Sequence, residues 1–228
     1  MNSRILYAVM ILGGFFVLTT LYDNFGIKNK PVKVLLVKNK ALEYYDKKDL
    51  QKLSDIVKNG ASASLETLSS LPYIKSANLS RSLSGVNQIK LSLQEPVFAL
   101  SSGESYKLVN SNGEIFSEVP QYKIPDLPIL SGKNFLIKKN RLAAANVLNK
   151  MPDAGVISKN TLSEVLFKDD MSFVFSGVEG EVYLGEKNIV KKVTRLVKVV
   201  KYLRFHGMAT QLIDARFDHK ITVSLKES

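Results

Sequence analysis

The sequence predicts an α+β protein with a transmembrane helix at its N-terminus. Three observations support this: an uncharged apolar run opens the chain, alternating apolar and polar residues recur in later segments, and two stretches carry apolar residues at helical spacing. We expect a short cytoplasmic tail at residues 1–4, a transmembrane anchor at 5–22, a linker at 23–31, a first folded domain at 32–95 and a second at 96–228.

The predicted anchor is the run ILYAVMILGGFFVLTTLY at residues 5–22, which has no charged side chain. A helix of this length is about 27 Å long and just spans the hydrocarbon core of a bilayer. The alternative, a cleaved signal peptide, would have a shorter apolar stretch and small residues at a cleavage site. Arg4 favours a cytoplasmic N-terminus and the lysines at 28–33 oppose it, but long domains cross regardless of charge. We therefore expect residues 23–228 outside the cytoplasm.

The composition limits the classes of binding partner and excludes thiol chemistry. The chain has no cysteine, so it can form neither a disulfide framework nor a thiolate metal site. Its 32 Lys and Arg against 21 Asp and Glu give a formal charge of +11. Such a charge suits anionic headgroups, cell-wall polyanions or an acidic partner segment. Nucleic acid is not expected as a partner, because an exported domain seldom meets any.

The first domain is predicted to run strand, helix, helix, strand, strand. Its strands are rich in β-branched and alternating apolar residues, and its helices show apolar residues three and four positions apart. Gly60 and Pro72 end the two helical patterns. The five elements are expected at residues 32–37, 41–60, 63–70, 73–83 and 88–94.

The second domain is predicted to be a mixed β domain with two helices. Asn112-Gly113 is a strong hairpin signal, because both residues tolerate positive φ. The first helix should bury one face, with Leu142, Ala145 and Leu148. Strands are expected at 97–100, 106–109, 162–167, 173–175, 182–184, 211–217 and 221–225, and helices at 137–151 and 188–205.

No catalytic, cofactor or metal motif is found in the sequence, so an enzyme is not expected. Nothing matches a phosphate-binding glycine loop, a metalloprotease helix or a serine-hydrolase elbow. His206 lies at a predicted helix end, where a cation suits the helix dipole, and is interpreted as a cap. Asp169 and Asp170 are interpreted as a hairpin tip rather than an acid–base pair.

The helix predicted at 188–205 has an apolar stripe and an opposite basic face. The stripe should pack inward, and no acidic residue interrupts the basic face. This face is either a solvated surface or a contact for anionic lipid, wall polymer or an acidic partner. The stripe consists of Ile189, Val193, Leu196, Val200 and Leu203, and the basic face of Lys187, Lys191, Lys192, Arg195, Lys198 and Lys201.

The strand predicted at 221–225 is a candidate sheet edge, because almost nothing follows it in the sequence. An edge strand has unpaired N–H and C=O groups to which another chain can add a strand. The alternative is an edge protected from pairing by Lys220 and Lys226.

Five segments and one arginine, in order, resemble the bacterial cell-division family FtsQ, called DivIB in Gram-positive bacteria. The resemblance is collinear over nearly the whole chain, and Arg81 falls where the family has an arginine after its first motif. Residues 71–77 (LPYIKSA) resemble LPWV-x-x-A, 95–99 (EPVFA) resemble E-x-P-V-A, 108–116 (LVNSNGEIF) resemble LVD-x-x-G-x-VF, 127–132 (LPILSG) resemble LP-x-LSG, and 213–217 (IDARF) resemble IDLRY.

The resemblance implies a single-pass (type II) protein of the bacterial inner membrane, with a POTRA domain at 32–95 and a β domain at 96–228 outside the cytoplasm, at the division septum. It implies a non-enzymatic divisome scaffold that binds an FtsB/FtsL-like pair through its last strands and, through that pair, the septal peptidoglycan synthase. The family's late tyrosine falls on Phe217 and its final tryptophan near Leu225. The expected partner-binding residues are Arg216, Phe217, Ile221, Val223 and Leu225.

A different function stays open alongside the scaffold. The chain could be a membrane-tethered domain that binds wall polymer or anionic lipid directly, through the basic face of the helix at 188–205. A steep loss of binding with added salt would favour this alternative. A POTRA module for outer-membrane protein transport is less favoured, since only one POTRA copy is expected.

Overall fold

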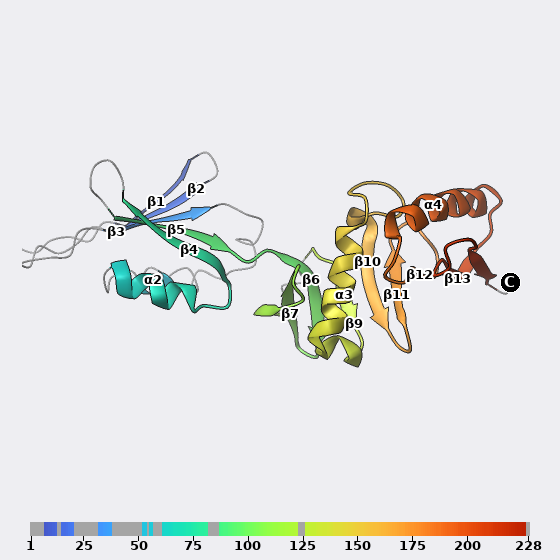
Figure 1. The fold of residues 1–228 in the computed structure, drawn as a ribbon, viewed down its shortest axis with the longest axis horizontal. Coiled ribbons are helices and arrows are strands. Elements are labelled where there is room, and N and C mark those ends of the chain that lie inside the picture. The colour runs from blue at the N-terminus through green and yellow to red at the C-terminus, as the bar shows by residue number, and fades with distance from the viewer. Residues whose placement is uncertain are drawn as a thin grey trace, which may run out of the picture. The chain divides into compact units, whose positions relative to one another are not determined.

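The structure is a computed structural model, and its chain divides into two compact units, Met1–Glu95 and Pro96–Ser228 (Figure 1). The described residues are 7–12, 15–20, 32–37, 52–53, 55–56, 61–81, 87–122 and 126–226.

The first unit contains a five-stranded sheet in the order β1-β2-β3-β5-β4. Strand β3 runs parallel to β5, and the other pairs are antiparallel. Helix α2 packs against β4 and β5, where Leu68 of the helix and Ile89 and Leu91 of β5 are fully buried. The elements are β1 (Tyr7–Leu12), β2 (Phe15–Thr20), β3 (Val32–Val37), α2 (Ala61–Ser69), β4 (Ile74–Arg81) and β5 (Asn87–Leu93).

The predicted strands and second helix of this unit are confirmed to within two residues at their ends. Most of the helix predicted at 41–60 lies outside the described residues. The four described positions in it, 52–53 and 55–56, are helical, and Leu53 is buried there.

The prediction of a transmembrane helix at 5–22 is wrong: the structure has two antiparallel strands, β1 and β2, in this run, with Leu12 opposite Phe15. The physical reason is local. Phe, Val and Thr dominate the second half and favour strands, and the sequence places Gly13 and Gly14 between the halves, a pair that weakens a helix and suits a two-residue hairpin. Among the residues that the structure describes, no helix is long and apolar enough to cross a bilayer.

The second unit is built on a nine-stranded mixed sheet in the order β14-β13-β12-β11-β10-β9-β6-β7-β8. The pairs β6–β9, β9–β10 and β12–β13 are parallel, and the others are antiparallel. The strands are β6 (Pro96–Ser102), β7 (Ser105–Asn110), β8 (Ile115–Pro120), β9 (Ile129–Ser131), β10 (Leu162–Phe167), β11 (Met171–Phe175), β12 (Glu181–Tyr183), β13 (Thr210–Asp214) and β14 (Thr222–Leu225).

Two helices contribute to the core of this unit. Figure 1 shows α3 (Lys138–Asn149) over the middle strands and α4 (Ile189–Phe205) toward the C-terminal strands. Short 3₁₀ turns at Lys133–Leu136 and Lys159–Thr161 precede α3 and β10. The apolar stripe predicted for α4 is confirmed, because all five of its residues are buried in the same cluster as the strands.

One continuous apolar row crosses the sheet, with each residue opposite the next. It consists of Leu100, Leu130, Val165, Phe173, Val182, Ile213 and Val223, on strands β6, β9, β10, β11, β12, β13 and β14. Six of the seven are buried, but Val223, on the last strand, is only partly buried. The apolar row therefore reaches the edge of the sheet without being covered there.

The helix α3 departs from prediction in its phase. Leu142, expected inside, is 37% exposed, while Arg141 is buried. The Arg141 Nε donates to the carbonyl of Gly113 at 2.8 Å, and Nη1 donates to that of Phe135 at 2.8 Å. Counting apolar residues placed the buried face one position too late, because an arginine was not expected inside. Ala145 and Leu148 are buried as predicted.

Helix α4 ends in a Schellman motif. Gly207 has φ 62°, and the N–H groups of Met208 and Gly207 donate to the carbonyls of Leu203 (2.9 Å) and Arg204 (3.1 Å). The expected cap at His206 is confirmed, since His206 is the C-cap residue. This closure turns the chain sharply from the helix into β13.

Candidate functional site

The predicted sheet edge is confirmed at β14, which comes last in the strand order. In the described part of the chain β14 pairs only with β13, and Ile213 lies opposite Val223. Both final strands are shorter than predicted, so Arg216 and Phe217 lie in the connection after β13 rather than within it.

The free edge of β14 presents backbone groups at alternate residues. The N–H of Lys226 donates to the carbonyl of Ala209, toward β13. Because N–H groups alternate along a strand, those of Val223 and Leu225 point away from β13. This edge is therefore available to accept and donate hydrogen bonds to an added strand.

The side chains along the edge are partly apolar and accessible. Ile221 and Val223 pack against the core while remaining partly exposed. Phe217 is 49% exposed and Leu225 is 47% exposed, and the ammonium of Lys220 lies 4.8 Å from the Phe217 ring centroid. Four of the five predicted partner-binding residues are thus apolar and at least partly accessible.

The fifth, Arg216, is held by two carboxylates. Its Nη2 lies 2.7 Å from Asp214 Oδ2 and its Nη1 lies 2.8 Å from Asp170 Oδ2. The guanidinium carbon also sits 5.1 Å from the ring centroid of Tyr183. Hydrogen bonds from Arg216 hold the pKa of Asp214 below its usual range, and the same bonds raise the pKa of Arg216. Arg216 is therefore fixed in place before any partner arrives.

Lys192, predicted on the exposed basic face, is buried, with 4% of its surface exposed. Its Nζ donates to the carbonyls of Leu184 (3.1 Å) and Arg216 (2.7 Å) and lies 3.9 Å from Asp218 Oδ1. The prediction of an exposed Lys192 is wrong because α4 places this side chain against the ends of β12 and β13. Backbone carbonyls there replace water around the ammonium. Lys192 therefore links the end of β12 to the connection after β13.

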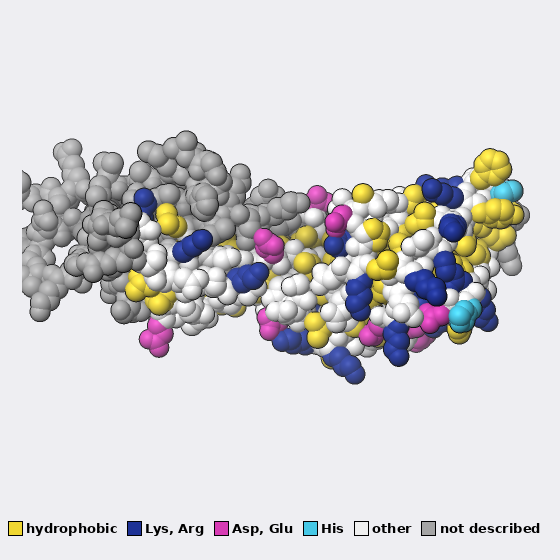
Figure 2. Space-filling model, turned by 45° about the horizontal axis from the view of Figure 1, so that its top comes forward, with side chains coloured by type: hydrophobic (Ala, Val, Ile, Leu, Met, Phe, Trp, Pro, Cys, Tyr) yellow, Lys and Arg dark blue, Asp and Glu magenta, His cyan; other side chains and the backbone are white. Residues whose placement is uncertain are grey.

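The remaining basic face is thinner than predicted. Arg195 is half-buried and donates to the backbone carbonyl of Asp218. Lys191, Lys198 and Lys201 are exposed. Figure 2 shows lysine and arginine side chains interspersed with hydrophobic ones at the C-terminal end of the second unit. Three lysines of α4 thus remain free to meet an anionic surface.

Sequence reasoning missed three residues of this site. It placed Asp170 at a hairpin tip, which is correct, but not against Arg216. Tyr183 and Asp218 had no assigned role, although Asp218 accepts a hydrogen bond from Asn188 at 3.0 Å that lowers its pKa. The spacing of Asp214 and Arg216, two residues apart at the end of β13, was the one sequence signal that could have indicated part of this cluster.

The described residues hold no group of three or more His, Asp or Glu side chains placed to bind a metal ion. What the edge offers is backbone pairing, apolar contact and positive charge.

Comparison with known protein families gives a match. The family described as "Cell division protein FtsQ/DivIB, C-terminal" matches residues 99–216, which run from β6 to the connection after β13. No curated protein matches the chain.

Proposed function

Because the chain belongs to the FtsQ/DivIB family, a family of non-catalytic division scaffolds matched here over just more than half of the sequence, we propose that it is a scaffold of the bacterial division machinery that links early and late division proteins.

The observation that carries the mechanism is the uncovered end of the apolar row at β14. A partner strand paired with β14 would complete the row beyond Val223 and bond the outward N–H groups of Val223 and Leu225. Backbone pairing would give affinity, and the side chains facing Phe217 and Leu225 would set the register. We propose that the partner is an FtsB/FtsL-like pair, and through it the septal peptidoglycan synthase.

Positive charge near the edge supports an acidic partner. Lys191, Lys198 and Lys201 are exposed on α4, the helix that joins β12 to β13. Arg216 is neutralised by Asp214 and Asp170 and would contribute position more than charge. Carboxylates on the partner would meet the three lysines and raise its association rate at low salt.

For the first unit, we propose a POTRA domain. Its central three strands run β3-β5-β4, with β3 parallel to β5 and α2 between β3 and β4 in the chain. This connectivity agrees with the strand-helix-helix-strand-strand order of that domain. Its proposed role is localisation of the scaffold.

The family match supports association with the inner membrane at the septum, with the second unit outside the cytoplasm. The full chain should therefore sediment with washed membranes and be released by detergent. A chain that stays in the soluble fraction would contradict this part of the proposal.

The edge is tested with two substitutions at one position, in the full chain. Leu225→Pro removes an outward N–H, whereas Leu225→Ala keeps it and trims only the side chain. Removing this one backbone bond should weaken capture of the partner pair from membranes by up to about tenfold, with a smaller loss for Leu225→Ala.

Equal losses for the two variants would assign the effect to the side chain and argue against strand addition. If neither variant changes capture, the edge is not the docking site. Loss of capture that instead follows added salt, together with binding of wall polymer, would favour the direct polymer-binding function of α4.

A further inference from the structure

Two lysines flank the exposed edge strand β14. Lys220 precedes Ile221 and Lys226 follows Leu225, and no acidic residue lies between the two lysines in the sequence. Both lysines are exposed. The edge to which a partner strand would be added is therefore basic at both of its ends.

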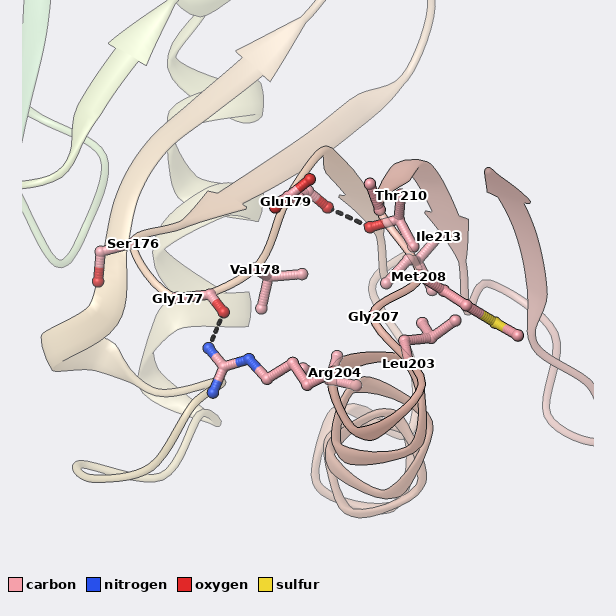
Figure 3. A pocket seen from close by; sticks show the side chains of 12 residues that line it. Ser176, Gly177, Val178, Glu179, Leu203, Arg204, Gly207, Met208, Thr210 and Ile213 are labelled. Atoms are coloured by element: carbon pink, nitrogen blue, oxygen red, sulfur yellow. Dashed lines mark hydrogen bonds between the residues drawn. The ribbon is translucent and has the colours of Figure 1, made fainter. Parts of the chain in front are cut away.

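Contacts hold both ammonium groups beside the strand. The Lys220 ammonium lies 4.8 Å from the Phe217 ring centroid. The Lys226 ammonium lies 3.5 Å from the carboxylate of Glu179, whose backbone carbonyl accepts a hydrogen bond from Thr210 on β13 (Figure 3). The side chains of Glu179 and Lys226 are both more than half exposed, so this ion pair is weak and Lys226 can also meet a second carboxylate.

Side chains alternate between the two faces of β14. One face is apolar and packs toward the core, as the partly buried Ile221 and Val223 show. The opposite face is polar and exposed, and it carries both lysines. The apolar face consists of Ile221, Val223 and Leu225, and the polar face of Lys220, Thr222, Ser224 and Lys226. The apolar pattern is symmetric about Val223, so it is the same in either chain direction.

This symmetry would let β14 pair with β14 of a second copy of the chain. In an antiparallel pair centred on Val223, the outward N–H groups of both strands would be bonded and the two apolar faces would be continuous. Lys220 of each copy would then lie opposite Lys226 of the other, with Cβ atoms about 5 Å apart. A register shift of two residues would leave them diagonal neighbours. Because like charges at such positions are destabilising, the lysines oppose self-pairing.

We propose that Lys220 and Lys226 determine which strand β14 accepts. They exclude a second copy of this chain and select a partner strand with carboxylates at the two positions opposite them, six residues apart. Three apolar side chains at alternate positions between those carboxylates would extend the apolar row beyond β14. The inference rests on the proposed strand addition and adds the charge and the spacing that the partner strand must have.

The test measures binding of labelled peptides to the full chain, solubilised in a non-ionic detergent, by fluorescence anisotropy. The lysine peptide copies residues 219–226, His-Lys-Ile-Thr-Val-Ser-Leu-Lys, and the glutamate peptide replaces both lysines by glutamate. The wild-type chain should bind the glutamate peptide at least about tenfold more tightly, because two repulsive pairs become attractive.

A third peptide tests the spacing. It has the sequence His-Thr-Ile-Glu-Val-Glu-Leu-Ser, which keeps the composition and the apolar positions of the glutamate peptide but places the carboxylates two residues apart. It should bind more weakly than the glutamate peptide, because its carboxylates cannot lie opposite both lysines at once.

Exchanging the charges of the chain should exchange its preference. The variant Lys220→Glu/Lys226→Glu should bind the lysine peptide more tightly than the glutamate peptide, by about the same factor. The matched control Lys133→Glu/Lys139→Glu changes two other exposed lysines and gives the same net charge, so it should keep the wild-type preference. Thermal unfolding of each variant checks that the fold is kept.

Three results would overturn the proposal: no binding of the glutamate peptide at millimolar concentration, equal affinity for the lysine and glutamate peptides, or a preference that the charge exchange leaves unchanged. Leu225→Pro separates this failure from failure of the proposed function. If Leu225→Pro weakens binding of peptides that are bound equally well, strand addition stands and only the role of the lysines is wrong. If it leaves binding of the glutamate peptide intact, the peptide binds elsewhere and both proposals are wrong.

Discussion

Lys192 carries a buried charge in the second unit. An ammonium out of water needs hydrogen-bond acceptors, and the carbonyls of Leu184 and Arg216 supply two of them. The contact joins the end of β12 to the connection after β13, so it fixes where the edge hairpin begins.

We predict that Lys192→Met lowers the free energy of unfolding by about 1–3 kcal/mol, because two carbonyls lose their donor in a buried site. Urea denaturation measures the change. The control is Lys191→Met on the exposed neighbouring position, which should change stability little. Equal effects at the two positions would mean that the carbonyl contacts contribute nothing.

Asp214 makes stability depend on acid. Its pKa in the folded protein is held below the ordinary 3.8, first by the hydrogen bond from Arg216. Its stabilisation is therefore complete above the ordinary pKa and is lost as the pH falls through the lowered value. Glu181 acts in the same direction, since the Ser172 hydroxyl lowers its pKa from 4.5.

We predict that the free energy of unfolding falls from about pH 5 downward and that Asp214→Asn flattens this fall while costing about 1–3 kcal/mol at neutral pH. The measurement is urea unfolding at a series of pH values. Asp169→Asn, at an exposed position of the neighbouring turn, is the control and should keep the wild-type slope.

At the scale of elements, the β7–β8 hairpin shows how a turn is tied to a helix. Gly113 has φ 70°, and a Cβ there would lie 2.6 Å from the backbone nitrogen of Leu142 in α3. Nearby, Asn110 Oδ1 accepts the N–H groups of Asn112 and Glu114, and Lys138 pairs with Glu114 at 2.8 Å. The hairpin and α3 are therefore packed backbone against backbone.

We predict that Gly113→Ala destabilises the protein by about 2–4 kcal/mol, from positive φ together with the clash. Gly103→Ala is the matched control: φ is 67°, but nothing lies within 4 Å of the added Cβ, so only about 1 kcal/mol is expected. Thermal unfolding compares the two variants. Equal losses would show that the close approach to α3 relaxes without cost.

The helices were predictable where a single apolar stripe decides their phase, as in α4. They were less so where a polar residue is buried. Arg141 and Lys192 both lie on the inner faces of their helices because each donates hydrogen bonds to backbone carbonyls there. Those carbonyls belong to segments distant in the sequence, so the pattern of residues within the helix does not predict them. The contact between Arg216 and Asp170 was unpredictable for the same reason, because Asp170 belongs to another hairpin.

At the scale of the molecule, the large apolar core lies entirely in the second unit, between Phe98 and Ala215. We predict that Pro96–Ser228 expressed alone unfolds in one cooperative transition and keeps the urea sensitivity of Lys192→Met. Circular dichroism and urea titration test this. A broad or absent transition would mean that the first unit contributes to the fold of the second.

Most strand positions and the α+β class followed from alternation and turn residues, whereas β1, β2, β8, β9 and the strand order did not. The parallel pairs β6–β9 and β12–β13 join segments far apart in the chain, and no local signal specifies them. In the N-terminal run, two local signals disagree. Its length and apolarity fit a helix, while its Phe, Val and Thr content fits the strands that the structure contains.

The burial of Lys192 also has a chemical consequence. An amine that is enclosed and hydrogen-bonded reacts slowly with acylating reagents, while Lys191, Lys198 and Lys201 on the same helix react freely. Acylation of Lys192 must wait until the end of β13 lifts away from α4, so its rate measures how often that hairpin opens. The acylation rate of Lys192, measured by mass spectrometry, therefore reports the rate at which the end of β13 opens locally.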